Sequence, residues 1–273
     1  MKQIIKNLTV FSLMTTIIVA CDKDEESHNE FSINIGKTVE FSKGNLQYQA
    51  STSTWRFADN QYDIIGADNS KISNSYDGWI DLFGWGTSGW DSGASAYQPY
   101  DTSTNYEDYY VGNDSKLNIT NEYKNADWGV QNKIINGEGL WRTLSNIEWN
   151  YLINQRNDAP LKRGMAVVND VFGLVILPDN WKQPGGTSFE PGAKINEYTA
   201  DQWRKMESAG AVFLPAAGYR CGIDMVDTEY GYYWSVSADG NMAHYLYFRS
   251  NNYVDVGKAY RNCGLSVRLV KDL

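Results

Sequence analysis

The stretch YGYYWSVSADGNMAHYLYFRSNNYVDVG, residues 230–257, carries the strongest structural signal in the chain. It consists of short runs rich in aromatic and β-branched residues, separated by Asp239-Gly240 and by Asn251-Asn252. Gly, Asn and Asp favour tight turns, and runs of this composition bounded by such residues predict strands joined by hairpins. We therefore expect closely spaced antiparallel strands in this part of the chain.

Residues 244–249 have the period of two that is typical of a strand with two different faces. One face carries His244, Leu246 and Phe248, and the other carries Tyr245, Tyr247 and Arg249. Leu246 and Phe248 are core residues by their chemistry, so the sequence predicts that the second set lies on the opposite, outer face.

Further strands are predicted on both sides of this stretch. The runs FSINI, TVEFS, NLQYQA and TWRFA follow one another between residues 31 and 58, with Gly36, Gly44 and Ser/Thr turns between them. Residues 166–178, AVVNDVFGLVILP, have the composition of a buried strand that Pro178 closes, and AVFLPAAGY and GLSVRLV add strands later in the chain. Within GLSVRLV, Arg268 alternates with Val267 and Leu269, and we expect it to form a structural ion pair.

Two helices are predicted from one N-terminal pattern. Ser145 is followed three residues later by Glu148, and Thr199 is followed by Gln202. Each pair forms a capping box, in which two side chains bind free N–H groups at the start of a helix. An apolar residue before each cap and a tryptophan after it can form a hydrophobic staple. The expected helices cover about 145–156 and 199–208.

The segment 60–127 has a different composition, rich in Gly, Ser, Asn, Asp and Tyr and poor in aliphatic residues. It shows neither a helical nor a strand period over a useful length. Long loop segments inside a domain are usually functional or disordered, and the many aromatic residues argue against disorder here. We expect ordered loops that are pinned by Trp79, Trp85 and Trp90.

The first twenty residues predict a bacterial lipoprotein signal peptide. Lys2 and Lys6 precede an apolar run of thirteen residues, 8–20, which suits a signal peptide and is too short for a membrane-spanning helix. The end of the run, Ile18-Val19-Ala20-Cys21, resembles a lipobox, which implies cleavage before Cys21 and lipid attachment to this residue. An ordinary signal peptide with a chance cysteine is the alternative.

Residues 21–30, with Asp22-Lys23-Asp24-Glu25-Glu26 at their centre, form a predicted acidic tether. Such a run cannot bury apolar area and stays solvated. It resembles the tag that sends lipoproteins of the Bacteroidetes to the outer face of the outer membrane. A solvated spacer without an address is the alternative.

Net charge excludes several classes of partner. Removal of residues 1–20 removes two of the 24 basic residues and none of the 33 acidic ones, which leaves a net charge of −11. A chain this acidic has no electrostatic footprint for nucleic acid, and we expect contact with the membrane through the lipid anchor only. Besides Cys21, only Cys221 and Cys263 are cysteines, and they form either one disulfide or two free thiols.

The chain resembles the Fibrobacter-succinogenes-major-paralogous family. The resemblance rests on GYR, YGYYWSVS, AHYLYF and YRNCGLSVRLV, and upstream on VEFSKGNLQY, WRFA, DLFGWGTSG, ADWG and WRTLSNIEW. It covers about Val39 to Val270 and implies one domain, residues 31–273, with the segment 60–127 as a loop-rich insertion. The implied fold is α+β and C-type-lectin-like, with mostly antiparallel strands, two helices and long ordered loops. Formylglycine-generating enzymes and ligand-binding proteins share this fold.

The resemblance suggests two chemistries, and the sequence lacks the full motif of each. The resemblance to formylglycine-generating enzymes implies a copper-dependent oxidation that uses two cysteines close together in the sequence. Cys221 and Cys263 lie far apart in the sequence, so this local pattern is missing. The resemblance to calcium-dependent lectins of this fold implies a Glu-Pro-Asn or Gln-Pro-Asp motif followed by Trp-Asn-Asp. The most similar segments of this sequence lack residues that these motifs need to bind calcium. A loose set of oxygen donors could hold Ca²⁺ or simply be solvated; it contains Asp101, Asn105, Glu107 and Asp108.

Catalytic motifs give no further candidate. His28 lies in the tether and His244 in a predicted strand, and no HExxH, GxSxG or phosphate-loop motif occurs. A carboxylate pair for glycoside hydrolysis cannot be located from sequence. We therefore expect neither catalytic residues nor a metal or cofactor.

The remaining expectation is a binding surface. In relatives of this fold the ligand face is built by the C-terminal strands and loops, and aromatic, amide and Arg side chains suit glycans or protein hot spots. The candidate ligand-binding residues are Trp234, Tyr245, Tyr247, Arg249, Asn251, Asn252, Tyr253, Asp255, Tyr260 and Arg261.

The leading hypothesis is a surface-exposed, lipid-anchored protein that binds a glycan or a protein. The alternatives are an enzyme of formylglycine-generating or glycan-active type, and an accessory subunit of a surface appendage.

Overall fold

The computed structural model describes residues 29–135, 137 and 140–273. The predicted signal peptide, Cys21 and the tether up to residue 28 lie outside these residues. The described chain combines short helices with many strands, most of them paired antiparallel, so the predicted α+β class is confirmed.

Within the described residues, the strands form five small sheets. Before helix 200–208 they are β1 (Phe31–Asn34), β2 (Lys37–Phe41), β3 (Leu46–Gln49), β4 (Thr54–Phe57), β5 (Ile134–Ile135), β6 (Arg163–Val168), β7 (Val171–Ile176) and β8 (Gly192–Tyr198). After it they are β9 (Val212–Pro215), β10 (Tyr219–Cys221), β11 (Asp224–Val226), β12 (Gly231–Asp239), β13 (Met242–Arg249), β14 (Tyr253–Tyr260), β15 (Cys263–Gly264) and β16 (Val270–Asp272). The strand orders are β1-β2-β16, β3-β4-β5, β8-β6-β7-β9, β11-β10-β15 and β12-β13-β14.

The helices are α1 (Trp128–Gln131), α2 (Asn146–Asn150) and α3 (Ala200–Ser208). A π-helical turn, η6 (Tyr151–Gln155), continues α2, and 3-10 turns are η1 (Ala50–Thr52), η2 (Gly66–Lys71), η3 (Tyr106–Tyr109), η4 (Val111–Asn113), η5 (Asn121–Ala126) and η7 (Ala159–Leu161). Within the described residues, none of these helices has the length and apolar character needed to cross a bilayer.

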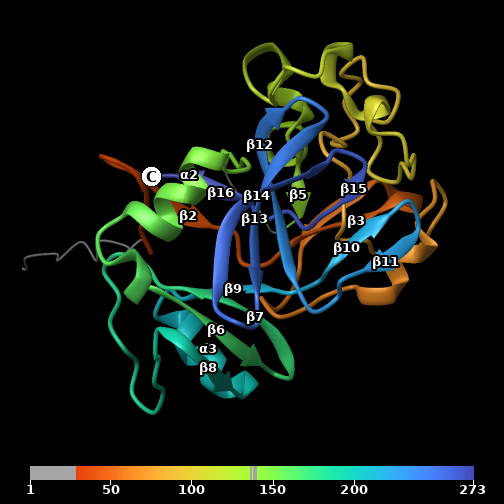
Figure 1. The fold of residues 1–273 in the computed structure, drawn as a ribbon. Coiled ribbons are helices and arrows are strands. Elements are labelled where there is room, and N and C mark those ends of the chain that lie inside the picture. The colour runs from red at the N-terminus through yellow and green to blue at the C-terminus, as the bar shows by residue number, and fades with distance from the viewer. Residues whose placement is uncertain (1–28, 136, 138–139) are drawn as a thin grey trace, which may run out of the picture.

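The sheet β12–β14 lies at the centre of the molecule (Figure 1). Its inner side packs on one core, to which Tyr233, Leu246 and Phe248 belong, and its other side contributes Trp234 and Ala243 to a second core. The predicted alternation along β13 is confirmed, since Leu246 and Phe248 are fully buried and the other set is half-buried. In the view of Figure 1, α3 lies below and the yellow loops lie above.

Both predicted helices begin where their caps place them. Ser145 and Glu148 form a complete capping box at α2, and Thr199 and Gln202 form another at α3. Each staple also forms a contact: the Tyr198 and Trp203 rings lie 5.8 Å apart, and Leu144 and Trp149 share one core. The local signal was therefore sufficient for the helix starts.

Two sequence predictions about strands were wrong in detail. Residues 166–178 form a hairpin rather than one strand: β6 turns into β7 at Asn169 and Asp170, whose φ values are 48° and 67°. Asn and Asp tolerate this left-handed conformation better than most residues, which was the missed turn signal. The run GLSVRLV is fully buried but only partly regular, with isolated bridges at Leu265 and Ser266 before β16.

The segment 60–127 consists of bends and the turns η2 to η5. Trp85 fixes it as predicted: its ring is fully buried, and its Nε1 donates to the Ser235 carbonyl at 2.8 Å. Trp79 and Trp90 are half-buried: Trp79 stacks under Arg56, and Trp90 packs against Tyr123.

Two buried arginines also hold this segment, and neither was anticipated in that role. Arg220 donates to the carbonyl oxygens of Leu82 at 3.0 Å and Asp101 at 2.9 Å. Arg261 donates to the Ser115 carbonyl at 2.6 Å and lies over the Trp85 ring at 4.4 Å. Carbonyl oxygens of the loops thus satisfy charges that belong to the C-terminal strands.

Candidate functional site

Six tyrosines form one continuous cluster over the outer side of β12–β14, and we call this cluster the tyrosine face. Its members are Tyr219, Tyr230, Tyr232, Tyr245, Tyr247 and Tyr253. Tyr232 is central, with ring centroids 5.4 Å from Tyr219, 5.5 Å from Tyr245 and 5.1 Å from Tyr247. Tyr253 is 42% exposed and the other five are half-buried.

Strand register explains why these rings meet. Tyr232 of β12 pairs with Tyr247 of β13, and Tyr245 of β13 pairs with Gly257 of β14. Side chains of paired residues point to the same side of a sheet. The Tyr245 ring lies directly over Gly257, where a Cβ atom would be 2.8 Å from ring carbons. Gly257 therefore makes room for this ring.

The rim of the tyrosine face carries charged groups that are hydrogen-bonded to neutral side chains. Arg249 donates from Nε to Asn251 Oδ1 at 3.1 Å, and its guanidinium lies 5.0 Å from the centre of the Tyr253 ring. The Tyr253 hydroxyl donates to Asp255 Oδ2 at 3.0 Å. These contacts leave an aromatic surface whose charged groups lie at its border.

A cavity of about 270 Å³ opens at one end of the tyrosine face. Three of the clustered tyrosines line it, together with Asp227, Lys258, Tyr260 and Cys263. Tyr232 donates from its hydroxyl to Asp227 Oδ2 at 3.3 Å. The cavity thus combines ring faces with hydroxyl, carboxylate and ammonium groups, a mixture that can orient a polar ligand.

Four tyrosines of this face, Tyr219, Tyr232, Tyr245 and Tyr253, stay protonated at neutral pH. Burial raises the pKa of Tyr219, Tyr232 and Tyr245 above the ordinary value of 10.0. The hydrogen bond to Asp255 raises the pKa of Tyr253 as well. Neutral hydroxyls donate and accept hydrogen bonds but are poor nucleophiles, which favours binding over catalysis at this site.

The sequence-predicted residues occupy three kinds of position. Tyr245, Tyr247, Arg249, Asn251, Tyr253 and Asp255 lie on the tyrosine face or its rim. Tyr260 borders the cavity and stacks on Tyr106 at 5.2 Å, and Asn252 forms the β13–β14 turn with φ 59°. Trp234 and Arg261 lie inside the protein: Trp234 Nε1 donates to the Phe83 carbonyl at 2.7 Å, and Arg261 binds loop carbonyls. We therefore assign these two to the support of the face.

Sequence reasoning missed Tyr219, Tyr230, Tyr232 and Asp227. Tyr219 lies on β10, and Asp227 and Tyr230 lie in the turn between β11 and β12, so two other segments complete the face. Tyr232 was recognisable from the alternation of β12, since it stands two residues before Trp234. The others depended on how the β10–β11 hairpin folds over the sheet.

The two cysteines are brought together although they lie far apart in the sequence. Cys221 of β10 and Cys263 of β15 are register partners in an antiparallel pair. Both are free thiols in this structure; Cys221 is exposed and Cys263 is half-buried. Burial, with a contribution from Cys221, raises the pKa of Cys263 to about 11.

The acidic set in the insertion uses its oxygens locally. Asn105 caps η3 by accepting from the Glu107 N–H at 3.3 Å, Asp108 accepts from Asn105 Nδ2, and Asp101 accepts from the Gln98 N–H at 2.7 Å. Across the described residues, no group of three or more His, Cys, Asp or Glu side chains is placed to hold a metal ion.

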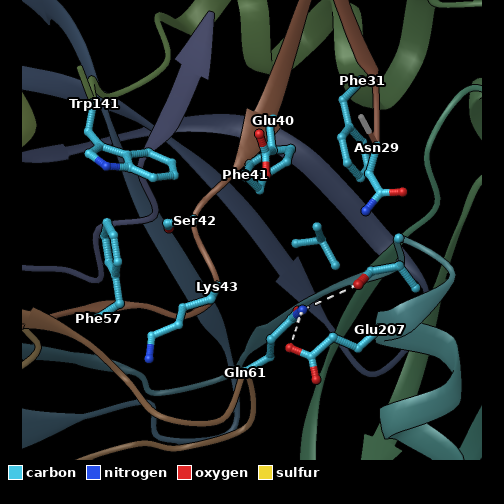
Figure 2. Close-up of a pocket in the computed structure, with 13 residues that line it drawn as sticks. Asn29, Phe31, Glu40, Phe41, Ser42, Lys43, Phe57, Gln61, Trp141 and Glu207 are labelled. Carbon is cyan, nitrogen blue, oxygen red and sulfur yellow. Dashed lines mark hydrogen bonds between the residues drawn. The ribbon is translucent and has the colours of Figure 1, made fainter. Parts of the chain in front are cut away.

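A second hollow, of about 280 Å³, lies between β2 and α3 (Figure 2). Its aromatic wall consists of Phe31, Phe41, Phe57 and Trp141. Gln61 at its floor donates to Glu207 Oε1 at 2.9 Å and accepts from Arg268 at 3.0 Å. Because these rings are buried and the amide is fully used, this hollow has less to offer a ligand than the tyrosine face.

Arg268 also corrects a sequence expectation. Its place in a buried strand predicted a structural ion pair, but its guanidinium donates to the amide oxygens of Asn45 at 3.2 Å and Gln61 at 3.0 Å. Burial lowers the pKa of Arg268 to about 10. The amide oxygens of Asn45 and Gln61 thus accept the hydrogen bonds that a carboxylate was expected to accept.

Comparison with known proteins adds no assignment. No family model matches the chain, and no curated protein or solved structure matches it either. The site is therefore interpreted from its own geometry.

Proposed function

We propose that this chain is a lipid-anchored protein of the outer membrane that binds a neutral glycan at the cell surface through the tyrosine face. The observation that carries the proposal is the continuous cluster of six partly exposed tyrosines beside a polar cavity. Aromatic rings stack on the apolar faces of sugars, and their hydroxyls bind sugar hydroxyls. The rim carries one cation, Arg249, and one anion, Asp255, each hydrogen-bonded to a neutral side chain, and this balance of charge favours a neutral ligand.

We further propose a C-type-lectin-like arrangement of the family that the sequence resembles. Two features support it: the long insertion is ordered by C-terminal residues, and β16 pairs with β2, which joins distant parts of the chain. Anchoring through Cys21 rests on the sequence of residues 1–30. Incorporation of radioactive palmitate that is lost in Cys21→Ala tests it.

A glycan array tests the binding proposal. Tyr247→Ala combined with Tyr253→Ala removes two rings that lie toward solvent, and we expect binding to weaken at least about tenfold. Tyr151→Ala, which removes a half-buried tyrosine next to α2, is the matched control and should bind like the parent. Unchanged binding by a folded double variant would contradict the assignment of the face.

Two conditions sharpen this experiment. Addition of EDTA should leave binding intact, because the face offers rings and hydroxyls rather than a cluster of carboxylates. An increase in salt should also have little effect on a neutral glycan, whereas an ionic protein ligand would dissociate. Loss of binding in EDTA would indicate calcium instead.

A protein ligand is the second candidate, and the position of β14 favours it. β14 is the last strand in the order β12-β13-β14, and an edge strand can pair with an extended segment of another protein. An accessory subunit of a surface appendage would use the same edge. Stable assemblies that form without glycan would support this candidate.

An oxidase of the formylglycine-generating type is the third candidate. The pairing of Cys221 with Cys263 on neighbouring strands favours this candidate, because formylglycine-generating enzymes use two cysteines that lie close together. Copper-dependent conversion of a peptide cysteine to an aldehyde, lost in Cys263→Ser, would support it over binding alone.

A further inference from the structure

The pairing of Cys221 with Cys263 has a defined geometry. β10 turns into β11 through Gly222 and Ile223, and Cys221 pairs with Asp224 at the closing position of this hairpin. In an antiparallel strand, the N–H and C=O groups of one residue point toward the same neighbour. Cys221 therefore directs its main-chain groups to β11, and its pairing with Cys263 on the other side is of the non-hydrogen-bonded kind.

Non-hydrogen-bonded pairs bring side chains closest together. Their Cα atoms lie about 4.5 Å apart, which is within the range of about 4.4–6.8 Å that disulfides require. Both thiols also point to the same side of the sheet, since paired residues share a face. The two sulfur atoms can therefore meet without movement of the strands.

The opposite side of this small sheet is filled by another pair. Arg220 lies across Gly264, where a Cβ atom would be 2.4 Å from Arg220 Cγ. The cysteines consequently lie on the other side, together with Tyr219, and Cys263 lines the cavity of the tyrosine face. A bond between the thiols would lie in the wall of that cavity.

We propose that Cys221 and Cys263 form a thiol–disulfide site, in which a small disulfide such as oxidised glutathione oxidises them and joins β10 to β15. The Cys221 thiolate attacks one glutathione sulfur, the glutathione S–S bond breaks, and one glutathione leaves as thiolate. The Cys263 sulfur, on losing its proton, then attacks the Cys221 sulfur and expels the second glutathione. Two protein thiols are oxidised, and one disulfide is reduced to two thiols.

Exposure sets the order of these steps. Cys221 is exposed and reaches the oxidant first, whereas Cys263 is half-buried and its raised pKa keeps it protonated. Cys263 reacts only once the mixed disulfide lies beside it. The resulting bond closes a chain loop of about forty residues, and restriction of the unfolded chain should raise the melting temperature by about 5–10 °C.

Peptide mapping tests the proposal in the full chain carrying Cys21→Ser, in which Cys221 and Cys263 are the only thiols. The protein is treated with oxidised glutathione under native conditions and digested with trypsin. Cleavage after arginine places Cys221 in the peptide 221–249 and Cys263 in the peptide 262–268. We expect these two peptides to be joined, with the mass of two hydrogen atoms lost, and the melting temperature to rise.

Several outcomes would overturn the proposal. They are a lasting glutathione adduct on Cys221 without a cross-link, failure of both thiols to react, and a cross-link that forms only in denaturant. Cys263→Ser is the control: it should stop at the adduct on Cys221 and show no thermal shift. The experiment needs no glycan, so its failure would leave the proposed binding function unaffected.

Discussion

The sheet β12–β14 and the insertion 60–127 are both rich in aromatic residues, yet they are ordered by different means. In the sheet, neighbours in register place Leu246 and Phe248 in one core and leave Tyr245 and Tyr247 half-buried on the opposite side. In the insertion, the chain follows no regular pattern and is fixed by distant residues such as Arg220. Local patterning suffices for the first region, whereas the second depends on contacts across the whole chain.

The buried arginines show what those distant contacts require. A charged group inside a protein is costly unless it is fully hydrogen-bonded. Arg220 meets this need with three carbonyl oxygens, at 3.0 Å, 2.8 Å and 2.9 Å. The loops and the arginine therefore stabilise each other, because ordered loop carbonyls lower the cost of the charge and the charge fixes the loops.

The largest effect is expected from Arg220→Met. The substitution leaves buried carbonyls without donors, and each such group costs about 1–3 kcal/mol, so we expect a loss of about 3–5 kcal/mol in the free energy of unfolding. Urea denaturation measures it. Arg204→Met, on the exposed side of α3 with a pair to Asp201, is the control and should cost less than about 1 kcal/mol. Equal losses of unfolding free energy in the two variants would show that Arg220 does not stabilise the insertion through its carbonyl contacts.

The next effect separates the two sides of the sheet β12–β14. Leu246→Ala creates a cavity in the core and should cost about 2–5 kcal/mol, whereas Tyr253→Ala at the rim should cost less than about 1 kcal/mol. Thermal and chemical unfolding of both variants measure the difference. If Tyr253→Ala were the more damaging, the tyrosine face would be part of the core rather than a surface.

Helix caps provide a smaller and strictly local effect. Ser145→Ala removes the acceptor for the Glu148 N–H, and Thr199→Ala removes the acceptor for the Gln202 N–H. We expect each to cost about 1 kcal/mol. Hydrogen exchange should increase only in the adjoining helix, α2 or α3. Faster exchange in the insertion would mean that local and distant order are coupled.

The smallest effect concerns pH. Burial, and then the charge of Lys258, lower the pKa of His244 below 6.5, while Asp239 opposes them. The unfolded chain therefore takes up this proton at higher pH than the folded chain, so the free energy of unfolding falls as pH decreases below about 6.5. His244→Gln should show a shallower decrease between pH 7 and 5. An identical pH profile would show that His244 titrates alike in both states.

The features that could be predicted from the sequence are those that depend on neighbouring residues, and the features that were missed depend on distant contacts. Strand runs in residues 31–58, the caps at Ser145 and Thr199 and the alternation of β13 are short-range signals, and each was confirmed. β8 was missed because GAKINEY is polar and pairs with β6 in parallel, which requires a distant partner. The partners of Arg268 were mistaken because nothing local identifies an amide as its acceptor.

The candidate site was found only in part for the same reason. Tyr245, Tyr247 and Tyr253 belong to one hairpin, so their common face could be inferred from alternation and register. Tyr219 joins them through a fold-back of β10 and β11 that no short segment specifies. The pairing of Cys221 with Cys263 likewise exists only in three dimensions.

The pairing of β2 with β16 has a consequence for folding during synthesis. Phe41 pairs with Val270, so the sheet that begins the described chain cannot close until residues more than two hundred positions later have left the ribosome. The sheet β1-β2-β16 therefore remains open until synthesis is almost complete, whereas the neighbouring strands β12, β13 and β14 can pair as soon as they emerge. Long-range pairing of this kind forms slowly, so the first strands of the described chain wait longest for their partner.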